Sequence, residues 1–123
     1  MRTLYQAAAD AAIRYAEHLD GRSVFPLKAD IESLQELDVP LQDEPVDPAV
    51  VFADLDRLGS PATVATTGGR YYGFVTGGSL PAVTAAAMLA AAWDQNGAYR
   101  VLSPINAALE EVGLGRLARQ PAR

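Results

Sequence analysis

The first repeating apolar pattern of the chain lies within its first twenty residues. One side of a helix would carry the apolar residues Leu4, Ala8, Ala12, Tyr15 and Leu19. Thr3 and Gln6 fit the spacing of a capping box, and Gly21 stands where a glycine ends a helix. This spacing predicts an amphipathic helix, which is marginal alone and needs a partner for its apolar face.

A second helix is predicted after Asp47-Pro48, since aspartate caps a helix start and proline suits its first position. Its apolar stripe is Val51, Leu55 and Leu58, and Gly59-Ser60-Pro61 ends it.

The segment between these helices, residues 21–46, is predicted to be mostly irregular. Pro26, Pro40 and Pro45 break its pattern, and only Ile31 to Leu37, after Asp30, is expected to form a short helix.

In the second half, residues 70–76 are predicted as a short extended piece between Gly68-Gly69 and Gly77-Gly78. Ser79 or Leu80 would cap a third helix, which has Pro81 near its start and runs to about Trp93.

A last helix is expected to open at Ser103-Pro104 and to be interrupted by Gly113 and Gly115. The fold class predicted for the whole chain is therefore mainly α.

Length and composition limit the chain to one domain at most. It has 123 residues, of which 50% are hydrophobic, but alanine supplies much of this share and buries little area, so we expect a thin core. Residues 1–60 hold 12 acidic and 5 basic side chains, which argues against a nucleic-acid partner. Without cysteine, and with His18 as the single histidine, neither a disulfide framework nor a zinc site of the usual ligands is expected.

No membrane segment is predicted. Asp10, Arg14 and Glu17 interrupt the N-terminal apolar stretch, so it is not a signal peptide, and the apolar run from Ala82 to Trp93 is shorter than the roughly 20 residues that span a bilayer. A cytoplasmic location is the expectation.

The aromatic residues between the glycine pairs leave two interpretations open. Tyr71, Tyr72 and Phe74 are compatible with ordinary strand packing or with a flat wall against an aromatic ligand. Gly77-Gly78-Ser79 is compatible with a turn into a helix or with amide groups that face an anion. No phosphate-loop motif is present, and His18 is expected to be solvated and not part of a catalytic triad.

Read in order, several motifs resemble one family. They are Phe25-Pro26-Leu27, the Asp47-Pro48 helix, Gly59-Ser60-Pro61, the run from Gly69 to Ala82 (GRYYGFVTGGSLPA), Trp93-Asp94-Gln95-Asn96, and Ser103-Pro104 with Leu109-Glu110-Glu111. Over roughly residues 20–112, the chain resembles the N-terminal part of the pyridoxal-phosphate-dependent group II amino acid decarboxylases, which have the aspartate aminotransferase fold (fold type I).

The resemblance implies a division of the chain and a role for each part. It implies a single partial domain, with an N-terminal helical arm (1–60), a substrate-pocket segment and alanine-rich helix (61–102), and the start of a catalytic domain (103–123). The arm would wrap the other subunit of a homodimer, and the loop from Trp93 to Ala98 would reach toward the neighbouring subunit's site.

The same resemblance implies a substrate-binding role for four residues: Phe74, Val75, Thr76 and Gly77. They would contact the side chain of an amino acid substrate, although family members often have proline where Thr76 stands.

The family's cofactor site has no counterpart in the sequence. Its Schiff-base lysine, its aspartate at the pyridine nitrogen, its stacking histidine and its phosphate-binding turn lie further along than this chain extends. Lys28, the only lysine, and His18 match none of these positions, and Gly113 to Arg123 depart from the family's apolar continuation.

These departures indicate a truncated product or gene model. We therefore expect no catalytic residue, no cofactor contact and no activity of the chain alone. The alternatives left open are a stand-alone helical dimerisation module and a non-functional product.

Overall fold

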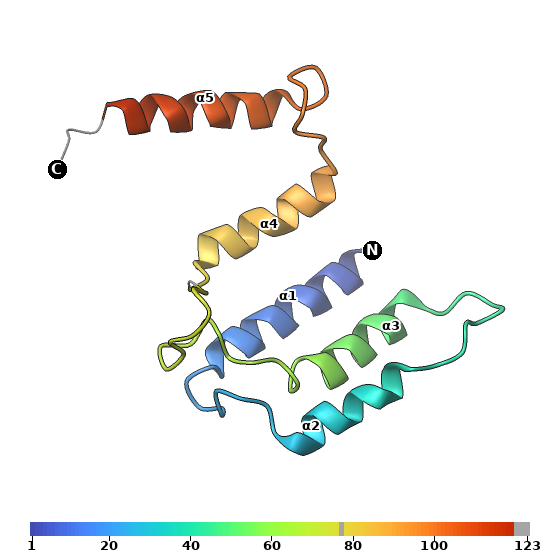
Figure 1. Cartoon of the computed structure of the whole chain (residues 1–123). Coiled ribbons are helices and arrows are strands. Elements are labelled where there is room, and N and C mark those ends of the chain that lie inside the picture. The colour runs from blue at the N-terminus through green and yellow to red at the C-terminus, as the bar shows by residue number, and fades with distance from the viewer. Residues whose placement is uncertain (77, 120–123) are drawn as a thin grey trace. The chain divides into compact units, whose positions relative to one another are not determined.

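All the regular structure is helical in the computed structural model, which describes residues 1–76 and 78–119. The α-helices are α1 (Arg2–Glu17), α2 (Lys28–Ser33), α3 (Pro48–Asp54), α4 (Pro81–Trp93) and α5 (Pro104–Ala118), as Figure 1 shows. Two short turns of other pitch are present, the 3₁₀ turn η1 (Leu34–Leu37) and the π turn η2 (Leu55–Gly59). The described residues contain no strand, and the mainly α fold class is confirmed.

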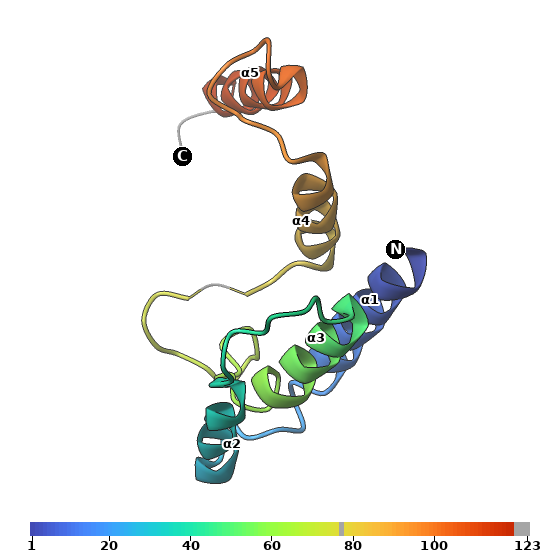
Figure 2. The same ribbon diagram turned by 90° about the vertical axis from the view of Figure 1, so that its right-hand side faces the viewer.

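The chain divides into two units, Met1–Gly78 and Ser79–Arg123. Within the first unit, α3 lies alongside α1, and the views in Figures 1 and 2 agree on this.

The start of α1 differs from the predicted capping box. The helix begins at Arg2, and the carbonyl of Met1 accepts its first hydrogen bond from the amide of Tyr5 at 3.1 Å. Thr3 therefore lies inside the helix, because Arg2 and the alanines that follow favour helix strongly enough to extend it. At the other end the chain turns through His18, whose carbonyl accepts from the amide of Gly21 at 3.1 Å.

The start of α2 also differs from the prediction. Asp30 was expected to precede this helix, but it lies in the first turn, where its Oδ2 accepts from the amide of Leu27 at 3.1 Å. The carboxylate thus supplies the reciprocal half of a capping box, and the helix begins at Lys28.

The predicted start of α3 is confirmed. The Asp47 carboxylate accepts from the amide of Ala49 at 2.9 Å, with Pro48 as the first helical residue. Its predicted stripe is buried only at Leu58, which is 3% exposed, whereas Val51 and Leu55 face solvent.

The apolar core of the described residues is small. Only three hydrophobic residues are buried, and all belong to the first unit: Ala11, Leu58 and Ala65. Two of the three are alanines, which agrees with the thin core expected from the composition.

In the second unit, the N-cap at Ser103 is confirmed. Its hydroxyl accepts from the amide of Asn106 at 3.4 Å, and the side chain is 1% exposed. The predicted interruption of α5 is wrong, because the helix continues through Gly113 and Gly115 to Ala118. Each glycine costs a helix about 1 kcal/mol, and good helix formers such as Leu114 and Arg116 flank them.

α4 is apolar on all sides yet carries no buried residue. Thr84 is its only polar side chain, and its exposed large side chains are Val83, Met88, Leu89 and Trp93. A helix with an apolar surface all round is normally buried. Among the described residues, no helix has the combination of length and apolarity that crossing a bilayer requires.

Candidate functional site

The aromatic segment, Arg70–Thr76, is not extended as predicted. Phe74 and Val75 have φ of 52° and 56°, in the left-handed region, and the amide of Thr76 donates to the carbonyl of Gly73 at 3.3 Å. Two consecutive left-handed residues reverse the chain direction, so the segment forms a turn. The sequence does not indicate this turn, because Phe74 and Val75 are not glycines and the aromatic residues alternate as in a strand.

The first half of the aromatic segment is packed. The rings of Tyr71 and Phe25 meet edge to face, with centroids 6.5 Å apart. The Tyr71 ring also folds back over Gly73, where a Cβ would stand 2.9 Å from its hydroxyl oxygen. A side chain at position 73 would therefore displace the ring.

The second half is open to solvent. Phe74 and Val75 are fully exposed, as is Tyr72 before them. Thr76 is exposed too, and its hydroxyl donates to the carbonyl of Gly73 at 3.1 Å. Of the four predicted substrate-binding residues, three thus adjoin on one exposed turn, and Gly77 lies outside the described residues.

Val75 is the most strained residue of this turn. A β-branched residue at positive φ is an outlier, because its branched Cβ crowds the backbone. Such strain costs of order 1–3 kcal/mol and is concentrated at functional sites. It is the structural feature of the aromatic segment that packing alone does not explain.

A shallow cavity of 230 Å³ lies elsewhere in the first unit, between α1 and η2. It is lined by Ala11, Arg14, Tyr15, His18, Arg22, Asp56 and Ser60. Its polar groups bond to one another: Arg14 pairs with Asp56 at 3.1 Å, Ser60 donates to the same carboxylate at 2.7 Å, and His18 Nδ1 lies 2.7 Å from the Arg14 carbonyl. These contacts join α1 to η2, and they give the cavity a structural role. His18 is exposed, as predicted.

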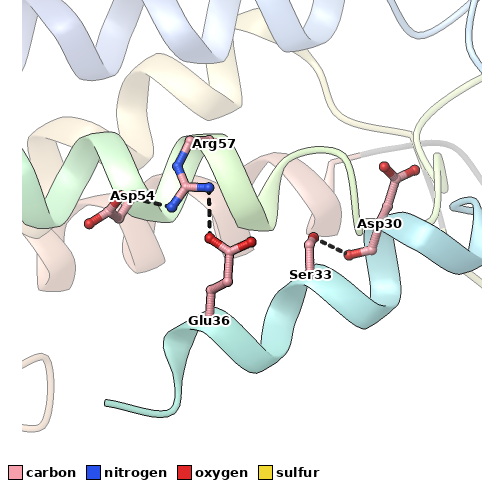
Figure 3. A network of polar contacts seen from close by, with 5 residues as sticks. All are labelled: Asp30, Ser33, Glu36, Asp54 and Arg57. Atoms are coloured by element: carbon pink, nitrogen blue, oxygen red, sulfur yellow. Dashed lines mark hydrogen bonds and ion pairs between the residues drawn. The ribbon is translucent and has the colours of Figure 1, made fainter. Parts of the chain in front are cut away.

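The ion pairs of Arg57 also have a structural role. Its guanidinium bonds to Glu36 at 3.0 Å and to Asp54 at 3.1 Å, and so joins η1 to the end of α3 (Figure 3). Hydrogen bonds to Glu36 and then to Asp54 hold the pKa of Arg57 above its ordinary value. Arg57 therefore stays charged, and its role is to hold η1 and the end of α3 together.

The described residues do not fit pyridoxal phosphate. A Schiff-base lysine is activated by desolvation or by a neighbouring cation. Lys28, by contrast, is 90% exposed, and its Nζ lies 3.3 Å from a carboxylate oxygen of Glu32. The residues described also contain no group of three or more potential metal ligands.

Comparisons with protein-family models, with curated proteins and with solved structures find no match to this chain.

If Val75 is strained by its positive φ, replacing it with glycine should relieve the strain. Because glycine adopts positive φ freely, Val75→Gly should raise the free energy of unfolding by about 1 kcal/mol relative to Val39→Gly. Val39 is a matched control, since it is also exposed, also outside a helix, and at negative φ. Denaturant unfolding followed by circular dichroism measures both, and equal losses in the two variants would contradict the strain.

Proposed function

We propose that this chain is the N-terminal part of a pyridoxal-phosphate-dependent amino acid decarboxylase, in which it supplies dimer contacts and part of the substrate pocket. The observation that carries the proposal is the order and spacing of the motifs from Gly69 to Glu111. The whole enzyme would remove the carboxylate of an amino acid, and this chain would act as an arm and a pocket wall.

The exposed apolar surface of the second unit supports the dimer contacts. α4 has no buried residue, and α5 also exposes Ile105, Leu109 and Val112. Burial of apolar area contributes about 25 cal/mol per Å², so such helices gain stability from a covering surface. Helices that pack on another subunit need faces of this kind.

The turn at Phe74 and Val75 supports the pocket wall. It offers two large apolar side chains that no other described residue covers. Thr76 adds one hydroxyl at the edge of this surface. Ligand pockets combine apolar walls with a few polar groups, and this turn has the composition of one such wall.

The cofactor would be bound by residues other than those described. Lys28 is paired with Glu32 on an exposed helix, so no step of the reaction is assigned to it. The chain alone should therefore be inactive.

The expected inactivity of the chain alone can be tested with pyridoxal phosphate. After incubation and borohydride reduction, peptide mass spectrometry should find no adduct specific to Lys28 and no decarboxylation of amino acids. Lys28→Arg is the matched control, and it should give the same absorbance spectrum as the unchanged chain. A stoichiometric adduct on Lys28 accompanied by turnover would contradict the proposal.

The uncovered surface of α4 favours a second candidate, a stand-alone helical dimerisation module. Size-exclusion chromatography with light scattering separates the two. The proposed arm, without the rest of its enzyme, should be monomeric or aggregated, whereas a module should elute as a discrete, well-folded dimer. Dissociation of that dimer by Met88→Asp, but not by Lys28→Asp, would place the interface on α4 and favour the stand-alone module.

A further inference from the structure

The turn that follows α1 presents main-chain carbonyls to a distant side chain. After Glu17 the chain turns, and the carbonyls of Leu19, Asp20 and Arg22 lie outside any helix. Among the described residues, no backbone amide donates to these three oxygens. Such carbonyls need side-chain or solvent donors.

The Nη2 of Arg70 shares its two N–H groups among all three. Its Nη2 lies 2.9 Å from the carbonyl oxygen of Asp20 and 3.4 Å from that of Leu19, and it also bonds to the carbonyl of Arg22. The partners are about fifty residues away in sequence, so these bonds determine where the aromatic segment lies. Hydrogen bonds from a charged donor are roughly twice as strong as neutral ones.

The acceptor turn is itself held in place by Arg22. The Arg22 guanidinium donates to the carbonyl of Ser60 at 3.0 Å, to that of Pro61 at 2.9 Å and to that of Thr63 at 2.8 Å. It also lies over the ring of Tyr15, 5.4 Å from the centroid. The turn after α1, to which Arg70 bonds, is therefore held against α1 and the residues that follow η2.

Arg70 stands immediately before the packed half of the aromatic segment. Tyr71, the next residue, contacts Phe25, and the exposed turn begins at Phe74. A chain of contacts thus links the turn after α1 to the exposed side chains. It runs from that turn to Arg70, and from there to the Tyr71 ring, which lies over Gly73 directly before Phe74.

We infer that Arg70 is the positioning residue of the aromatic segment. It fixes Phe74, Val75 and Thr76 relative to α1 through main-chain carbonyls and contacts no substrate itself. That these side chains form a substrate wall rests on the proposed function, but the anchoring does not. In an assembled enzyme, loss of Arg70 would raise KM for the amino acid more than it lowers kcat.

NMR of the full chain tests the anchoring without any assay of activity. Wild type should show nuclear Overhauser effects between the rings of Phe25 and Tyr71. Arg70→Met keeps an unbranched apolar side chain and removes the donors, so these effects should disappear and the Tyr71 amide should exchange about tenfold faster. Arg70→Lys retains a charged donor and should restore part of both signals.

Arg57→Met is the matched control, because it removes an exposed guanidinium of the same unit whose partners are two carboxylates. It should leave the Phe25–Tyr71 signals unchanged. Unchanged signals in Arg70→Met would overturn the inference, whatever the chain does as part of an enzyme.

A measurement on the unchanged chain covers the case in which Arg70→Met does not fold. If Arg70 is held by three carbonyls, rotation of its guanidinium is hindered, and its Nη protons should give separate resonances. The Nη protons of Arg2, on the exposed end of α1, should average. Averaged resonances for Arg70 would contradict the inference.

Discussion

Arg22 reaches from the turn after α1 to the turn after η2, where its guanidinium donates to three main-chain carbonyls. The first unit depends on this contact, because the apolar residues buried in its described part are Leu58 and two alanines. Fully burying a leucine side chain contributes about 1.5–3 kcal/mol, and a hydrogen bond to a charged group contributes a similar amount. Polar contacts between turns thus carry a share of the stability that a larger core would otherwise supply.

The second unit has no buried hydrophobic residue among those described. The alanine-rich α4 can form locally but buries little area, and neither α4 nor α5 contains a buried residue. Exposed helices and one strained, solvent-facing turn are what an arm of a larger assembly would present. The proposed role as the N-terminal part of a decarboxylase explains both features together, since another surface would cover the helices and a substrate would meet the turn.

The sequence predicted two local helix caps, but it missed a local turn and the contacts between distant residues. The caps at Asp47 and Ser103 were predictable because each side chain bonds two or three residues ahead. The turn at Phe74 and Val75 was not, since these residues disfavour positive φ. The roles of Arg22 and Arg70 were also not predicted. Their carbonyl partners lie about forty to fifty residues away, and every residue has a main-chain carbonyl, so the sequence does not indicate which ones accept. For the proposed substrate-binding residues, only the family resemblance provided a signal.

Thermal unfolding of Arg22→Met, followed by circular dichroism, tests most directly whether guanidinium–carbonyl bonds hold the first unit together. The loss should be about 3 kcal/mol, which is a large part of the stability of a small domain, so the cooperative transition should disappear or shift far downward. Arg2→Met, which removes an exposed arginine of α1, is the control and should unfold as wild type does. An unchanged transition in Arg22→Met would contradict the account.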